Sequence, residues 1–176
     1  EQLSSPELIV PLDVVFCPNC KLVQITESVS PEILFCRNYP YYSSVSKTLL
    51  EHFKASATEP IESRKLDSNS LVIEAASNDG YMLRNFVEKG IPVLGIDPAE
   101  GPVQAAKQAG IQTLCTFFGK DLALQLREEK GSMADLFLAN NVLAHVHDLN
   151  GFVDGINIIL KDCGEAVLEV HYVADL

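Results

Sequence analysis

Short apolar runs alternate with helical patterns from about residue 70 to the end of the chain. The runs have the length of buried strands, and the segments between them carry apolar residues three and four positions apart, as amphipathic helices do. This alternation predicts a parallel sheet with a helix between successive strands. Strands are expected at 71–76, 92–97, 111–115, 134–139 and 165–171, and helices at 80–89, 102–109, 119–130 and 149–160.

Right-handed crossovers restrict the order in which such strands can pair. With a single switch point, the pattern favours the strand order 3-2-1-4-5 in a Rossmann-like α/β fold. A ligand is then expected at the carboxyl ends of strands 1 and 4, where the strand order reverses.

The first 70 residues follow a different pattern. Short apolar runs mixed with prolines are typical of a small loop-rich module. Helical spacing from Val45 to Phe53 predicts a helix over 43–57, and the polar stretch 59–69 reads as a linker. We therefore divide the chain into a partial module at 1–42, a helix and linker at 43–69, and a main domain at 70–176.

Composition narrows the class of protein. A chain of 176 residues with 47% hydrophobic content can bury a core of normal size. A net charge of −11 repels phosphate backbones, so nucleic acid is not an expected partner. No apolar run approaches the ~20 residues of a membrane helix, and five irregularly spaced cysteines do not suggest a secreted disulfide framework. We expect a soluble cytoplasmic protein without a membrane partner and, because the chain starts at Glu1 rather than Met, a fragment of a longer one.

The loop after the first strand is the most informative segment. A dinucleotide-binding loop requires three glycines, whereas Ala75-Ala-Ser-Asn-Asp-Gly80 has one. The difference favours a ligand with an adenosine but no pyrophosphate, of which S-adenosylmethionine is the commonest. Asn-Asp-Gly is also a common turn, in which Asn78 and Asp79 can cap the following helix.

A carboxylate ends the second predicted strand of the sheet. Asp97 lies where it can accept hydrogen bonds from both hydroxyls of a ribose. It precedes Pro98, so capping of the helix at 102–109 is the alternative. The loop and the carboxylate together are more specific than either alone.

Polar residues also end the fourth predicted strand. Asn140 and Asn141 can bind the amino-acid group of the cofactor or the acceptor, and His145 can move a proton or hold a sugar hydroxyl. The alternatives are that the amides only end the strand and that the histidine is structural.

Two features of the N-terminal part could also carry chemistry. Cys17 and Cys20 form half of a zinc site, with Cys36 and His52 as candidate further ligands, while redox chemistry is the weaker alternative. Tyr41, Tyr42 and Ser43 precede the first helix, where they can stack on an adenine or close over a sugar nucleotide; burial in the core is the alternative.

Several segments taken together resemble the sugar C-methyltransferases that act on nucleotide-linked keto-deoxysugars. They are Phe16–Gln24, Tyr42–Ser44, Glu74–Gly80, Leu94–Ala99 and Ala139–Val146. The resemblance implies an N-terminal zinc module with two cysteine pairs, a class I methyltransferase domain and a C-terminal part that helps to hold the sugar nucleotide. It also implies that Cys17 and Cys20 are the second zinc pair, that the first pair is missing here, and that the main general base lies beyond Leu176.

The resemblance implies the following site. His145 is a candidate catalytic residue, Tyr41, Tyr42 and Ser43 face the substrate, and Cys17 and Cys20 bind zinc. The cofactor-binding residues are Glu74, Ala76, Ser77, Asn78, Gly80, Asp97, Pro98, Asn140 and Asn141.

Three functions therefore remain open. The first is an S-adenosylmethionine-dependent C-methyltransferase with a small-molecule nucleotide-sugar substrate, present here as a fragment that binds cofactor without turning over. The second is a methyltransferase for another small molecule, acting at oxygen or nitrogen. The third is a non-catalytic interaction module made of a zinc site and a degenerate Rossmann domain. An NAD-dependent oxidoreductase is disfavoured by the single glycine.

Overall fold

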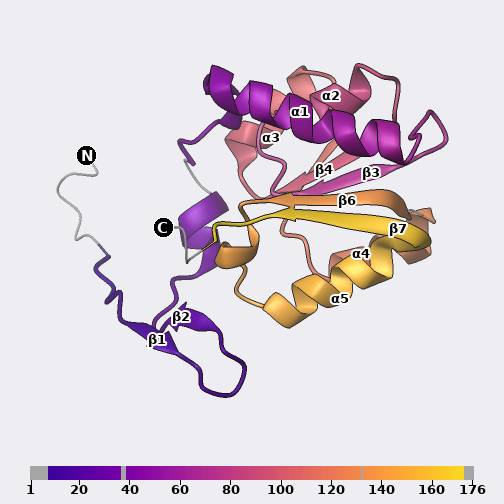
Figure 1. The fold of residues 1–176 in the computed structure, drawn as a ribbon. Coiled ribbons are helices and arrows are strands. Elements are labelled where there is room, and N and C mark those ends of the chain that lie inside the picture. The colour runs from indigo at the N-terminus through magenta and orange to yellow at the C-terminus, as the bar shows by residue number, and fades with distance from the viewer. Residues whose placement is uncertain (1–7, 37–38, 132, 173–176) are drawn as a thin grey trace.

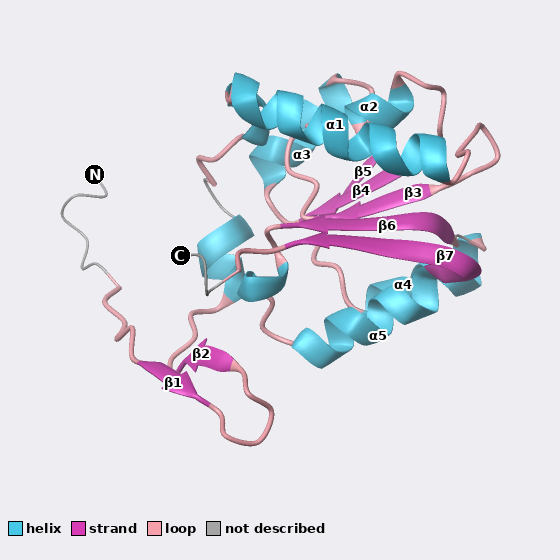
Figure 2. Ribbon diagram, viewed as in Figure 1, coloured by secondary structure: helices cyan, strands magenta, loops and turns pink. Residues whose placement is uncertain are grey.

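A five-stranded parallel sheet forms the centre of the computed structural model, which describes residues 8–36, 39–131 and 133–172. The strand order is β5-β4-β3-β6-β7, which confirms the predicted order 3-2-1-4-5 and places the switch point between β3 and β6 (Figure 2). The strands are β3 (Val72–Ala75), β4 (Val93–Asp97), β5 (Thr113–Cys115), β6 (Ala134–Asn140) and β7 (Leu160–Glu169).

Helices cover both faces of the sheet (Figure 1). One layer contains α1 (Lys47–Ser63), α2 (Arg84–Val87) and α3 (Glu100–Gln108), and the other contains α4 (Lys120–Lys130) and α5 (Leu149–Ile159). None of the helices within the described ranges is long and apolar enough to cross a bilayer.

Alternation along β3 decides which side chains enter which layer. Val72 belongs to the core on the α1 and α2 side, and Ile73 and Ala75 belong to the core against α4 and α5. Because side chains alternate across a strand, Glu74 points into the same layer as Val72, where it is fully buried. The sheet therefore places a carboxyl group inside an apolar layer, one strand position before the predicted ligand loop.

The N-terminal helix extends further than predicted. The prediction of a linker at 59–69 is wrong for residues 59–63, which belong to α1. A short helical turn, Ser43–Val45, precedes α1, whose first turn is capped by the Ser46 hydroxyl accepting from the Leu49 amide. The helix then continues to Ser63 through Pro60, because Phe53, Ala57 and Pro60 are buried on one face. Burial of this face outweighs the loss of one helical hydrogen bond at proline.

Two further boundaries differ from the prediction. The helix expected at 80–89 is reduced to α2, a single turn, because residues 81–83 fold as buried turns after Gly80. The last strand begins at Leu160 rather than at 165, and its register against β6 shifts between Ala134 and Leu136. Residues 162–164 therefore belong to an irregularity of the edge strand, before the part that pairs in register with β6.

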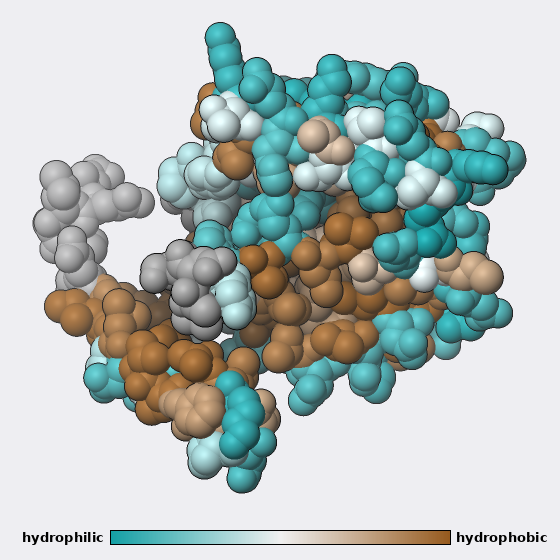
Figure 3. Space-filling view, viewed as in Figure 1, coloured by the Kyte–Doolittle hydropathy of each residue, from teal (hydrophilic) through white to brown (hydrophobic). Residues whose placement is uncertain are grey.

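A small hairpin lies apart from the sheet (Figure 1). Its antiparallel strands are β1 (Val14–Phe16) and β2 (Val23–Ile25), and a short helix, Glu32–Cys36, leads toward the main domain. The hairpin exposes apolar side chains, seen as a brown band in Figure 3. This arrangement agrees with a loop-rich N-terminal part that has little core of its own.

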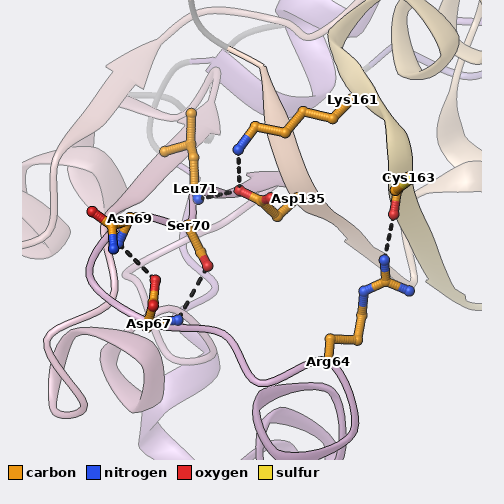
Figure 4. Close-up of polar contacts among 8 residues, drawn as sticks. All are labelled: Arg64, Asp67, Asn69, Ser70, Leu71, Asp135, Lys161 and Cys163. Atoms are coloured by element: carbon orange, nitrogen blue, oxygen red, sulfur yellow. Dashed lines mark hydrogen bonds and ion pairs between the residues drawn. The ribbon is translucent and has the colours of Figure 1, made fainter.

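Polar contacts join the elements at the amino ends of the strands, away from the predicted ligand loop (Figure 4). The Asp135 carboxylate accepts from the Leu71 amide at 2.8 Å and from Lys161 Nζ at 2.7 Å. The Arg64 guanidinium at the end of α1 donates to the Cys163 carbonyl and to the Glu165 carboxylate. These bonds hold α1 and the edge strand β7 on the sheet.

Candidate functional site

A cavity of about 430 Å³ opens at the carboxyl ends of β3, β4 and β6. Its volume is in the range of small-molecule sites. The predicted site residues that line it are Tyr41, Ser43, Ala76, Asn78, Asp97, Pro98, Asn140, Asn141 and His145. Glu74, Ser77, Gly80 and Tyr42 do not line it, and the Cys17–Cys20 pair lies on the hairpin.

Asp97 is the charged group best placed for a ligand. It ends β4 with only 4% of its surface exposed, and its two oxygens accept the amides of Asn78 at 2.9 Å and Ala99 at 2.8 Å. Burial raises its pKa, and these two hydrogen bonds partly offset the rise. Each oxygen keeps a lone pair for a ligand hydroxyl. Asp97 is not the N-cap residue of α3, which is Ala99, but its bond to the Ala99 amide lies at the start of that helix.

The first loop approaches the cavity through a backbone that most residues avoid. Ala76 has a φ of +55° and Asn78 a φ of +48°, and Gly80 continues the turn at +79°. The small Ala76 side chain leaves the backbone open to the cavity, as a glycine would. Ser77 points the other way and is buried beside Gly95, where an added Cβ would lie 2.6 Å from the serine hydroxyl.

The side chains of Asn78 and Asp79 do not cap the following helix, which corrects that expectation. Asn78 Oδ1 accepts from the Ser43 amide at 2.9 Å, and Asn78 Nδ2 donates to the Tyr41 carbonyl at 3.1 Å. Asp79 Oδ2 accepts from the amide and the hydroxyl of Ser44. These partners lie more than 30 residues earlier in the chain, so local sequence could not have indicated them.

A buried polar cluster lies behind the loop. Glu74 Oε1 accepts from Asn140 Nδ2 at 3.2 Å. Glu74 Oε2 makes no hydrogen bond, although the Tyr81 hydroxyl lies near the carboxyl group. Burial raises the pKa of Glu74 to about 8, and the nearby Asp97 and Asp79 carboxylates add to the rise. The carboxyl group is therefore mostly protonated at neutral pH.

Glu169, which ends β7, bonds to Asn141 at the edge of the cavity and to His52. Its backbone carbonyl accepts from the Asn141 amide at 2.7 Å and its carboxylate from Asn141 Nδ2 at 2.6 Å. His52 Nε2 lies 2.6 Å from the second carboxylate oxygen. His145 is exposed on the cavity wall, with its ring 6.2 Å from that of Phe35.

The aromatic part of this cavity was not predicted from the sequence. Phe117 and Phe118 follow β5, Phe152 belongs to α5, and Phe35 and Tyr39 come from the N-terminal part. Phe117 and Phe118 could have been predicted, because they follow the carboxyl end of a strand in the predicted sheet. The positions of Phe35 and Tyr39 depend on how the N-terminal part folds back onto the sheet.

Cys17 and Cys20 lie in the turn of the hairpin. The Cys17 amide donates to the Leu22 carbonyl, and the Lys21 amide donates to the Cys17 carbonyl. Lys21 has a φ of +65°. Hydrogen bonds from the backbone of Cys20 and then Asn19 lower the pKa of Cys17, which favours the thiolate that binds a metal. Two ligands make half of a zinc site, and the described residues contain no group of three or more ligating side chains. Within these residues, neither Cys36 nor His52 forms such a group with Cys17 and Cys20.

A family model described as "Methyltransferase domain" matches residues 73–168, and one described as a zinc binding domain matches residues 1–35. C-methyltransferase NovU from Streptomyces niveus is 29% identical over 170 residues, which is 97% of this chain and 40% of that protein. The chain thus spans about 40% of the length of this curated relative.

Solved structures show the same fold at low sequence identity. DesVI from Streptomyces venezuelae superposes with a TM-score of 0.56 at 14% identity, over 70% of this chain and 52% of DesVI. Magnesium protoporphyrin IX methyltransferase from Synechocystis PCC 6803, solved with bound SAM, gives 0.54 at 17% identity, over 72% of this chain and 64% of that one.

Proposed function

The chain belongs to the methyltransferase domain family, and we propose that it is the cofactor-binding part of an enzyme that transfers a methyl group to carbon in a nucleotide-linked keto-deoxysugar. The observation that carries this proposal is Asp97, a buried carboxylate at the end of β4 that faces a cavity beside a loop with little glycine. The similarity to C-methyltransferase NovU and the sequence motifs quoted above support the acceptor.

The residues around the cavity fit S-adenosylmethionine. Asp97 can accept the ribose hydroxyls, the backbone at Ala76 allows close approach, and the aromatic residues after β5 offer an apolar wall to an adenine. Asn140 lines the cavity and can bind the amino-acid end, and the buried Glu74 holds the Asn140 amide from behind, where a nearby ammonium would favour the ionised carboxylate. When bound, the cofactor supplies an electrophilic methyl group on a sulfonium.

The acceptor needs a base, because a carbon beside a ketone must lose a proton before it can form a bond to a methyl group. His145 is exposed on the cavity wall, where it could take that proton, and Asn141 and Tyr41 could bind sugar hydroxyls. We infer that the main base belongs to a part of such enzymes that this chain does not cover, since the chain spans about 40% of C-methyltransferase NovU. We therefore expect this chain to bind cofactor without turnover.

Zinc belongs to the same proposal. Cys17 and Cys20 would supply two of its four ligands, and the metal would order the exposed hairpin rather than take part in the reaction. Metal analysis after equilibration with zinc should show less zinc in Cys17→Ser than in the wild type, with the exposed Cys115→Ser as matched control. Equal zinc in all three proteins would exclude the pair as ligands.

An assay of methyl transfer tests whether the acceptor is a carbon atom of a nucleotide-linked keto sugar. The full-length protein is incubated with methyl-labelled S-adenosylmethionine and a dTDP-linked 4-keto-6-deoxysugar, and the product is examined by NMR. A new carbon–methyl bond beside the ketone supports the proposal. A methyl group on oxygen or nitrogen would favour the alternative small-molecule methyltransferase, and a protein that binds no cofactor would favour the interaction module.

A further inference from the structure

One wall of the cavity comes from the chain that precedes α1. Tyr39, Tyr41 and Ser43 line the cavity, and we name the stretch Tyr39–Ser44 the wall segment. Tyr41 is 48% exposed, so the apolar core holds this part of the segment only partly. Something other than packing must therefore fix its position.

Buried polar side chains of the first loop hold the wall segment in place. The Asn78 side chain bonds to the backbone of Tyr41 and Ser43, and Asp79 bonds to Ser44. Asn78 is 6% exposed and Asp79 is 4% exposed, so the bond to the Ser43 amide is buried and the bonds to Tyr41 and Ser44 are shielded on the side of the first loop. Shielded bonds to a charged group are stronger than neutral exposed ones.

The same loop contacts the expected ribose site. The Asn78 amide donates to Asp97 Oδ2 at 2.9 Å, so one residue touches both Asp97 and the wall segment. Asp79 does not line the cavity. The hydrogen bonds of Asp79 can therefore affect a ligand only through the position of the wall segment.

We propose that Asp79 and the Asn78 side chain are positioning residues that clamp the wall segment against the first loop, and that this clamp couples Asp97 to the position of Tyr41. The inference rests on the proposed function, because it assumes that the ligand at Asp97 is the cofactor. Its consequence is that the clamp strengthens binding of the cofactor while leaving the contacts of Asp97 intact.

The position of the wall segment can be measured without any ligand. The chain contains no tryptophan, so Tyr41→Trp creates a single fluorescent reporter. Only the carbonyl of residue 41 takes part in the clamp, so the substitution leaves the hydrogen bond in place. Acrylamide quenching of this reporter is compared with and without Asp79→Ala or Asn78→Gly. Glycine keeps the positive φ of residue 78 and its backbone bond to Asp97.

We expect either substitution to raise the quenching constant about twofold while the far-UV circular dichroism stays unchanged, since each removes shielded hydrogen bonds to the segment. Asn85→Ala is the matched control, because this amide also bonds to backbone carbonyls but lies away from the cavity. Unchanged quenching in both Asp79→Ala and Asn78→Gly would overturn the clamp.

Ligand binding then distinguishes an effect of Asp79 on the position of the wall segment from an effect of its charge on the ligand. With Asp79→Ala we expect the Kd of S-adenosylhomocysteine and of S-adenosylmethionine to rise by the same factor, about 3- to 10-fold. A loss confined to the cationic S-adenosylmethionine would show that Asp79 acts through its charge and would overturn the clamp. If the parent protein binds neither ligand, the proposed function fails, whereas the quenching experiment without ligand still decides the clamp.

Discussion

Replacing Glu74 by glutamine should stabilise the protein at neutral and alkaline pH. Glu74 is fully buried on β3, and one of its oxygens lacks a hydrogen-bond partner. Burial raises its pKa from 4.5 to about 8, so the folded state keeps a proton that the unfolded chain releases. A carboxyl group with a raised folded-state pKa favours the folded state below pH 4.5, and this contribution is lost as the pH rises through 8.

The size of the effect follows from the two pKa values. Between them, the free energy of unfolding falls by ~1.4 kcal/mol per pH unit. The accumulated loss is about 3 kcal/mol at pH 7 and about 5 kcal/mol above pH 9. Glutamine has nearly the same shape as the protonated acid and cannot ionise, so Glu74→Gln should avoid this loss and match the wild type near pH 4.

Urea unfolding followed by far-UV circular dichroism at pH 5, 7 and 9 measures the difference. The exposed Glu88→Gln serves as control, since it removes one carboxylate without touching the core. A gap between Glu74→Gln and the wild type that widens with pH supports the reasoning. Parallel curves for the two proteins would refute it, because Glu74 would then ionise alike in the folded and unfolded states.

Two further substitutions test the backbone of the first loop. Gly80→Ala should destabilise the fold by about 2–4 kcal/mol in urea unfolding, because its Cβ would lie 2.2 Å from Ile111 Cδ1 at a φ of +79°. Gly90→Ala has a similar φ of +72° but no atom within 4 Å, so it should lose only about 1 kcal/mol, and equal losses would argue against the steric explanation. Ala76→Gly should relieve the left-handed conformation and change stability by less than about 1 kcal/mol, while a large loss would mean that the alanine methyl group packs in the site.

The order of the sheet could be predicted because each strand and helix carries its own periodicity and because crossovers have a fixed hand. That order also placed Asp97, Asn140 and Asn141 at one edge, where all three line the cavity. The extent of α1 was missed because the polar composition of residues 59–69 predicts a linker. The buried face of Phe53, Ala57 and Pro60 has helical spacing and could have shown the continuation.

The contacts of Asn78 and Asp79 lay outside what local sequence can show. Asn-Asp-Gly predicts a turn and a helix cap, and the turn is present, but both side chains bond to residues 41–44 instead. Such bonds depend on the path by which the N-terminal part returns to the sheet. The same holds for Phe35 and Tyr39, which reach the cavity from a segment with no periodic pattern.

Calorimetric titration of the chain with S-adenosylhomocysteine, beside Asp97→Asn and Asp135→Asn, tests the central claim most directly. Both aspartates accept a backbone amide, but Asp135 lies at the opposite end of the sheet. The account predicts micromolar binding by the wild type and by Asp135→Asn, and a loss of about 1–3 kcal/mol in Asp97→Asn, the scale of a hydrogen bond to a charged group. Equal affinity in all three folded proteins, or no binding by the wild type, would contradict a cofactor site at Asp97.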